Sequence, residues 1–351
     1  MDPCLLVTID VESDNLWAGR PEQTFENIRQ IPRVHAFCER FGVRPTYLIT
    51  YPVATSELGR QVFTPIAKSG TAEIGSHMHV WTTPPLAPLT AADSKYAPYA
   101  TEIPYELQLE KMKNLTQAVG NLSGTAPRSH RAGRFGFDGR GLRVLEELGY
   151  AADTSVTPAW DWREPAHNGG LRGPDFSRAP FEPYYPDRED VSRPGSSSVL
   201  EVPVSCFISR PLPRSVALWL ARLPRNNNLV RVLRWGGFVR HAWLYPRRDV
   251  DGRTLRGVAE ALLAAGVPVL NVFFHSSEMA VGTSPYTPTE AEVEDSYRKL
   301  GELFELALGP LRTQSVTLSE LAELYRSSRS PSPVRVSRQE GTPGREKLRA
   351  H

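Results

Sequence analysis

Short apolar runs alternate with stretches of helical periodicity in the first part of the chain. The apolar run at residues 5–9 is followed by residues 25–41, where apolar positions recur three and four residues apart. A second run at 46–49, a second helical stretch at 58–68 and a short run at 72–74 continue the pattern. This order of strand, helix, strand, helix and strand predicts a mainly parallel sheet or barrel.

The same alternation extends to about residue 326. The further elements that the pattern predicts are helices at 107–119, 142–148, 255–265, 289–308 and 317–326, a strand tip at 151–157, and strands at 199–204 and 267–274. Asp138 is expected to be the N-cap of the helix at 142–148. Residues 81–104 are rich in Pro, Thr and Ala and have little periodicity, which is typical of a long loop that shapes a substrate pocket.

Composition divides the chain into a folded region, 1–327, and a tail, 328–351. An insertion is predicted at about 159–250, and its first part is dense in Trp, Pro, Gly and charged residues, so we expect irregular structure there. Trp160 is expected to belong to an aromatic binding wall, and a plain surface insertion is the alternative. The tail is rich in Ser, Pro and Arg and cannot bury enough apolar surface to offset chain entropy, so we expect a disordered basic tail.

Titratable side chains follow three of the predicted strands at the point where each strand ends. Asp10 and Glu12 follow the first run, His77 and His79 follow the third, and His275 ends the last strand. The carboxyl ends of parallel strands are where active sites of α/β folds collect. Side chains two residues apart on an extended segment share a face, so both imidazoles can converge on one ion. The sequence therefore predicts a metal site, with a pair of surface histidines as the alternative.

Charge and cysteine content exclude several classes of protein. The formal charge is +2, but residues 329–351 carry six basic residues against two acidic ones, so the rest of the chain is slightly acidic. No globally basic domain is present, and generic nucleic-acid binding is therefore disfavoured. The three cysteines are widely separated and show no ligand spacing, so we expect reduced core residues.

No signal segment or long apolar run is apparent. The first strand is predicted within a few residues of Met1, and no run approaches ~18 apolar residues. We therefore expect a cytoplasmic protein.

Five segments, in this order, resemble the motifs of the polysaccharide deacetylase family, which is built on the NodB homology domain. They are Thr-Ile-Asp-Val-Glu at 8–12, His77 with its neighbours, Arg-Ala-Gly-Arg-Phe-Gly at 131–136, Asp-Thr-Ser at 153–155 and Phe-Phe-His at 273–275. Each motif is weak alone, but together they extend over most of residues 4–326. The resemblance implies a distorted (β/α) barrel of about seven strands with irregular insertions.

The resemblance also implies a reaction, the deacetylation of N-acetylated sugars with a divalent ion. Asp10 would be the general base that deprotonates the attacking water, Arg131 would hold Asp10 in position and keep it ionised, and His275 would protonate the departing amine. An amide is a poor electrophile with a poor leaving group, so its hydrolysis needs a polarising ion, a base and an acid. The candidate substrate-binding residues are Trp81, Arg134, Asp153 and Trp160.

The sequence departs from the family pattern in two places, and both concern the metal. Val11 separates Asp10 from Glu12, where many members have adjacent carboxylates. The second ligand of most members stands four residues after the first, and that position is Trp81 here. Either His79 replaces that ligand, which gives a site of Glu12, His77 and His79, or the metal is weakly held. The two-histidine, one-carboxylate set favours zinc, with nickel, cobalt or manganese as alternatives.

The leading functional hypothesis is a metal-dependent hydrolase that removes an acetyl or other small acyl group from an amino sugar in the assembly of a surface glycan. The alternatives are the same fold acting on a formylated sugar or a cyclic amide, and a catalytically inactive glycan-binding relative. Residues 202–248 contain nine arginines, three tryptophans and no acidic residue. This composition favours peripheral contact with the inner membrane face and a lipid-diphosphate-linked saccharide. Arginines paired with acids elsewhere in the fold are the alternative.

Overall fold

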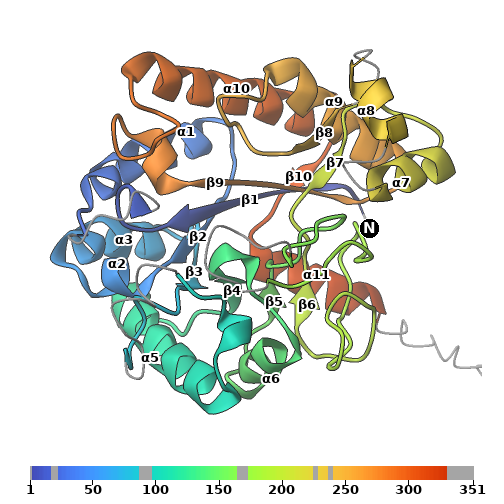
Figure 1. The fold of residues 1–351 in the computed structure, drawn as a ribbon. Coiled ribbons are helices and arrows are strands. Elements are labelled where there is room, and N and C mark those ends of the chain that lie inside the picture. The colour runs from blue at the N-terminus through green and yellow to red at the C-terminus, as the bar shows by residue number, and fades with distance from the viewer. Residues whose placement is uncertain are drawn as a thin grey trace, which may run out of the picture.

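The computed structural model describes residues 2–16, 23–86, 97–163, 173–223, 228–235 and 240–329. Within them, seven parallel strands lie side by side in the order β9, β1, β2, β3, β4, β5, β6. Their bounds are β1 Cys4–Val11, β2 Thr46–Ile49, β3 Glu73–Met78, β4 Ser129–Ala132, β5 Ala152–Asp153, β6 Leu200–Glu201 and β9 Val269–His275. The strands curl into an incomplete barrel with helices around it (Figure 1), which confirms the predicted distorted (β/α) barrel.

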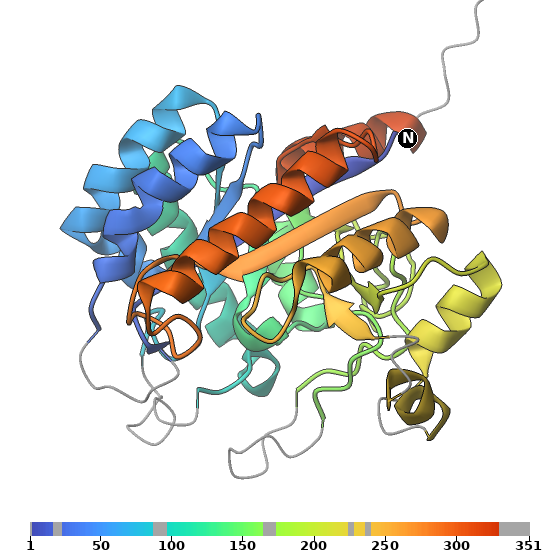
Figure 2. The same cartoon turned by 90° about the horizontal axis from the view of Figure 1, so that it is seen from above.

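Helices cover the outside of the curled sheet, as the view from above also shows (Figure 2). The helices that follow the strands are α1 Ile31–Arg40, α2 Tyr51–Thr55, α3 Glu57–Ser69, α5 Tyr105–Ser123, α6 Gly139–Glu147, α9 Gly252–Ala264, α10 Glu290–Leu308 and α11 Leu318–Arg329. A further short strand, β10 (Gln314–Ser315), pairs with the first two residues of β1. None of the helices in the described part of the chain is long and apolar enough to cross a membrane.

The alternation of side chains along β1 separates the core from the site. Leu5 and every second residue after it pack in the large apolar core with the surrounding helices. Cys4 and Leu6 point the other way, into a smaller cluster that Leu318 of α11 joins. This cluster fills the barrel interior at the start of the strands. Asp10 has the same parity as Cys4 and Leu6, so it faces the interior near the other end.

Among the described residues, no strand ladder joins β6 to β9. Instead, Asn271 of β9 donates through its side-chain amide to the carbonyls of Val202 (3.3 Å) and Pro203 (3.1 Å). Beyond this junction the insertion forms an antiparallel pair, β7 (Cys206–Ile208) and β8 (His241–Trp243). Two short helices, α7 (Arg214–Arg222) and α8 (Asn228–Trp235), lie between these strands in the sequence.

Several element boundaries differ from the prediction. The stretch at 25–41 divides into a 3-10 helix, η2 (Glu26–Gln30), and α1, which has a proline in its first turn. β4 was not predicted, because its four residues include a buried histidine and a buried arginine and form no apolar run. Asp138 is confirmed as the N-cap of α6, since its side chain accepts from two backbone amides.

Two further predictions concern the cysteines and the carboxyl-terminal tail. All three cysteines are buried and none is joined in a disulfide, as expected. The tail predicted at 328–351 lies outside the described residues, except that α11 extends to Arg329.

Candidate active site

The carboxyl-terminal ends of four strands bring the predicted titratable residues together. Strand register places Asp10 opposite His275 of β9, and His77 of β3 opposite Arg131 of β4. Residues opposite each other on neighbouring parallel strands present their side chains to the same face, so all four point into the barrel. Glu12, two residues after Asp10, joins the same group, and its carboxylate lies near the imidazole rings of His77 and His79.

Asp10 is held by the guanidinium group of Arg131. Arg131 Nη1 donates to Asp10 Oδ1 at 2.6 Å, and both side chains are buried. Arg131 also donates through Nη2 to Thr8 Oγ1 at 2.7 Å and through Nε to the Thr154 carbonyl at 3.0 Å, which fixes its plane. Burial on its own would raise the pKa of Asp10, but nearby positive charge, that of Arg131 above all, lowers this pKa below its ordinary value. Asp10 is therefore an ionised, oriented carboxylate.

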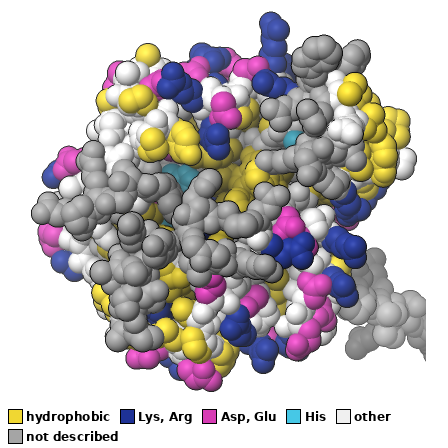
Figure 3. Space-filling model, in the orientation of Figure 1, with side chains coloured by type: hydrophobic (Ala, Val, Ile, Leu, Met, Phe, Trp, Pro, Cys, Tyr) yellow, Lys and Arg dark blue, Asp and Glu magenta, His cyan; other side chains and the backbone are white. Residues whose placement is uncertain are grey.

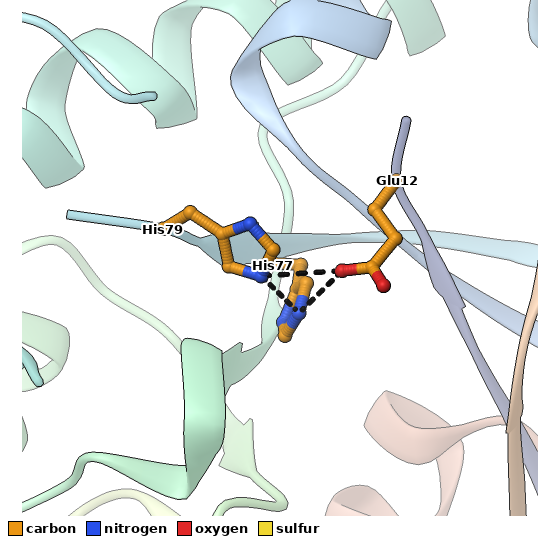
Figure 4. Close-up of side chains that lie close together, drawn as sticks. All are labelled: Glu12, His77 and His79. Atoms are coloured by element: carbon orange, nitrogen blue, oxygen red, sulfur yellow. Dashed lines mark hydrogen bonds and ion pairs between the residues drawn. The ribbon is translucent and has the colours of Figure 1, made fainter. Parts of the chain in front are cut away.

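Three possible metal ligands converge beside Asp10, as Figure 4 shows for Glu12, His77 and His79. The Nε2 atoms of His77 and His79 lie 2.9 Å apart, and Glu12 Oε2 lies 3.3 Å from His79 Nε2 and 3.9 Å from His77 Nε2. All three side chains are buried, and Glu12 Oε2 has no hydrogen-bond partner among the described residues. A buried carboxylate oxygen without a donor beside two imidazole nitrogens is an environment that a divalent cation fits.

The protonation states of these groups also favour ligation. His77 Nδ1 donates to the carbonyl of Arg131 at 3.0 Å, so the neutral ring presents its Nε2 lone pair to the cluster. Burial lowers the pKa of His77 to about 4 and that of His79 well below its ordinary value, so neither ring is protonated at neutral pH. Burial raises the pKa of Glu12 to about 8. An added cation would restore the charged form of this carboxyl.

His275 lies on the other side of the two carboxylates. Its Nε2 atom is 3.9 Å from Asp10 Oδ2 and 3.9 Å from Glu12 Oε1. Its Nδ1 atom is 3.3 Å from the Tyr245 hydroxyl and 3.6 Å from the Glu278 carboxylate, and Tyr245 also donates to Glu278. Burial would lower the pKa of His275, but Glu12, Glu278 and Asp10 raise it to about 10. His275 is therefore an imidazolium that can donate a proton at neutral pH.

Tyr245 and Glu278 were missed in the sequence. Glu278 belongs to the 3-10 helix η5 (Ser276–Met279), which begins directly after His275, and its spacing of three residues could have indicated a contact. Tyr245 follows β8, thirty residues before His275 in the chain, and no local pattern points to it. Only the packing of the insertion against the barrel reveals the contact.

A cavity of about 740 Å³ opens beside Asp10, His77 and His275. Arg134 and Trp160, two of the predicted substrate-binding residues, line it. The other aromatic side chains of its wall are Tyr99, Phe135, Trp162, Trp243, Tyr245, Phe273 and Tyr286. Figure 3 shows histidine atoms near the middle of this face, next to apolar side chains.

Trp81 and Asp153, the other two predicted substrate-binding residues, lie outside the described lining of this cavity. The ring of Trp81 stacks on that of His79, with centroids 4.4 Å apart and an interplanar angle of 17°. Asp153 is completely buried and accepts hydrogen bonds from His130 Nδ1 at 2.7 Å and from the backbone amide of Ser155 at 2.9 Å. The geometry therefore does not support a substrate contact for Asp153, which instead supports the turn after β5.

Comparison with known proteins identifies the fold. No family model and no curated protein matches the sequence. A protein from Mycobacterium smegmatis that is described as a polysaccharide deacetylase has a similar structure, with a TM-score of 0.54, 13% identity and 99% of both chains covered. A protein from Parabacteroides distasonis described as a glycoside hydrolase/deacetylase has a TM-score of 0.60 and 15% identity, over 94% of this chain and 73% of that one. The PuuE allantoinase has a TM-score of 0.53 and 12% identity, over 94% and 92%.

The chain is thus a curled parallel barrel with its titratable residues at the carboxyl ends of the strands. More specifically, it has the NodB-type fold of polysaccharide deacetylases, as the resemblance of its motifs predicted.

Proposed function

We propose that the protein is a metal-dependent hydrolase that removes an acetyl or other small acyl group from an amino sugar during glycan biosynthesis. The observation that carries the proposal is a base and an acid beside three ligand atoms. Asp10 Oδ2 and His275 Nε2 lie 3.9 Å apart, Asp10 Oδ2 is 3.9 Å from His77 Nε2, and His275 Nε2 is 3.9 Å from Glu12 Oε1. A pure glycan-binding protein needs neither an oriented base nor an acid.

The two proton-transfer groups have complementary roles. Asp10 takes a proton from the attacking water while the water oxygen bonds to the carbonyl carbon of the substrate. The C–N bond then breaks, and His275 gives its proton to the departing nitrogen, which leaves a free amine and a carboxylic acid that ionises to the carboxylate at neutral pH. Arg131 keeps Asp10 ionised and oriented, and Tyr245 contacts Nδ1 of His275, so that Nε2 faces Asp10 and Glu12.

Glu12, His77 and His79 would hold the metal ion. Two imidazoles and one carboxylate suit a catalytic zinc site that keeps an open position, and we therefore propose zinc, with nickel, cobalt or manganese as alternatives. When bound there, the ion supplies Lewis-acid polarisation of the substrate carbonyl.

The cavity supports a saccharide substrate. Its volume of about 740 Å³ falls in the range of ~300–1,000 Å³ that is common for small-molecule sites. Its wall combines flat aromatic faces, which can stack on a sugar ring, with the guanidinium group of Arg134. We extend the proposal to a saccharide carried on a lipid diphosphate. The cytoplasmic location remains a prediction from the sequence.

The test is the release of acyl groups from a panel of sugars. The zinc-loaded protein should release acetate from at least one N-acetylated amino sugar, and chelation followed by zinc should abolish and restore this release. Formate release from N-formyl sugars, or ring opening of a cyclic amide, would favour the alternative in which the same fold acts on a formylated sugar or a cyclic amide. An allantoinase is among the proteins of similar fold. Saccharide binding without turnover of any panel member would favour the inactive glycan-binding protein.

A further inference from the structure

The two short helices of the insertion expose apolar side chains. α7 exposes Val216 and Trp219, and α8 exposes Leu229 and Val232, with exposed fractions between 42 and 63%. Of the large apolar side chains that are exposed in the described part of the chain, these four are half. Each pair is three residues apart on its helix and therefore shares a face. We call these four side chains the α7–α8 surface.

Helix α7 is apolar on two sides. Ala217, Leu220 and Ala221 are buried and anchor the helix on the protein, while Val216 and Trp219 face solvent. A helix at the surface of a water-soluble domain normally presents polar residues there. Figure 3 shows apolar side chains gathered at the right edge of the molecule, where Figure 1 places α7 and α8. A gathered apolar surface of this kind marks an interaction site.

The charge of the two helices has one sign. Together they contain four arginines and no acidic residue. Arg214, Arg240, Arg247 and Arg248 pair with acidic side chains, so the alternative raised from the sequence holds for these four. In all four pairs the arginine side chain is solvent-exposed, and pairs of this kind contribute little to stability. Such arginines can exchange their partners for phosphate groups.

We propose that the α7–α8 surface docks the protein on an anionic lipid membrane. The four apolar side chains would enter the headgroup boundary, and the net positive charge of the two helices would favour anionic lipids. The combination of an exposed tryptophan, exposed aliphatic side chains and arginines without acids is the composition of interfacial helices. Both helices are far too short to span a bilayer, so the mode of contact is peripheral.

The position of these helices in the chain connects the docking surface with the cavity. α8 ends at Trp235, and Arg240, His241 and Trp243 already line the cavity. The five residues from the end of α8 to Arg240 can span at most about 18 Å. A docked protein therefore holds the cavity near the headgroups, where the saccharide of a lipid diphosphate would lie. This last step rests on the proposed function, whereas the docking itself does not.

The experiment compares matched variants of the full-length protein on vesicles. Cosedimentation is measured with vesicles of phosphatidylcholine alone and of phosphatidylcholine with about 30% phosphatidylglycerol, at low salt and at about 0.5 M NaCl. The test variant is Leu229→Ser with Val232→Ser on α8. The control is Leu324→Ser with Val281→Ser, which removes the same two side-chain types from positions of 39 and 47% exposure elsewhere. Thermal unfolding checks that both variants fold.

The expected result is binding of the wild type to the anionic vesicles only, weakened by salt. The test variant should partition at least about tenfold more weakly, because it loses most of its insertable apolar area on α8, and the control should bind as the wild type does. Equal binding of the test variant would overturn the proposal. No binding of the wild type would also overturn it, as would a wild-type dimer in light scattering that the test variant converts to monomers. Acyl release from a soluble sugar, measured in parallel, reports on the proposed function independently.

Discussion

Gly133 has no side chain and therefore leaves room for the imidazole ring of His79 beside Glu12 and His77. Gly133 begins the 3-10 helix η4 (Gly133–Phe135), directly after the strand that carries Arg131. A Cβ atom on Gly133 would lie 2.4 Å from Cδ2 and 3.2 Å from Nε2 of His79, and 2.8 Å from the carbonyl oxygen of Met78. On another side of the same ring, Trp81 stacks at a centroid distance of 4.4 Å. The imidazole therefore has little room to move.

We predict that Gly133→Ala weakens metal binding. Ordinary carbon contacts begin at 3.4 Å, so the His79 ring would have to move by about 1 Å, or the backbone would have to shift. Overpacking of this kind costs about 1–3 kcal/mol of stability. Displacing a group that orients a metal ligand typically costs about 10–100-fold in metal affinity. Competition with a chromophoric zinc chelator measures the affinity, and thermal unfolding of the metal-free protein measures the stability.

Gly120→Ala is the matched control for this prediction. Gly120 lies within α5, and a Cβ atom there meets nothing closer than 3.7 Å. The change should leave zinc affinity unaltered and stabilise the helix by up to about 1 kcal/mol. Wild-type zinc affinity in Gly133→Ala would refute the reasoning: either the ring is not held as described, or His79 is not a ligand. The stability measurement separates these cases, because a destabilised variant with unchanged affinity points to the second.

Three further predictions concern the same site. His77→Ala and His79→Ala should each lose bound metal, as measured by elemental analysis, and full occupancy in His79→Ala would remove that residue from the ligand set. Asp10→Asn and His275→Ala should keep the metal and lower kcat by about 10²–10⁴-fold, and near-normal turnover would exclude them from proton transfer. Because burial raises the pKa of Glu12 to about 8, whereas the ligand histidines are already neutral, zinc should displace about one proton below pH 8. The zinc affinity should then fall about tenfold per pH unit below pH 8. Titration calorimetry measures this affinity, and its repetition in buffers of different ionisation enthalpy measures the number of protons released. A pH-independent affinity between pH 6 and pH 8 would contradict the prediction.

The sequence located the site because the strands that end in it are apolar runs. β1 and β9 are recognisable by composition, and each delivers a titratable group at its last residues. The spacing of two between Asp10 and Glu12, and between His77 and His79, then places each pair on one face. These inferences need only the period of an extended strand, which is a local property of the chain.

Other parts of the site depend on register and packing, which are not local. His130 and Arg131 follow each other on β4 and therefore face opposite sides of the sheet. Register places Asp153 opposite His130, so its carboxylate lies on the outer side, whereas Arg131 reaches Asp10 inside the barrel. A motif match cannot distinguish these two faces when the strands are as short as β5 and β6. The contact of Tyr245 with His275 likewise requires the insertion to be packed in place.

Trp81 stands where most members of the family that the motifs resemble have their second metal ligand. The turn that follows β3 explains how a tryptophan fits at this position. The backbone amides of Thr82 and Thr83 both donate to the carbonyl of His79, at 3.3 and 3.0 Å, and this turn folds Trp81 back over the imidazole. A ligand four residues after His77 would have to reach the ion from that turn. A ligand two residues after it instead lies on the same strand face, where its Nε2 atom is 2.9 Å from that of His77. In the proposed site, where His79 is a ligand, Trp81 stacks on the imidazole of His79 and Gly133 lies against another part of the same ring, so the two departures at 79 and 81 would form one rearrangement of the site.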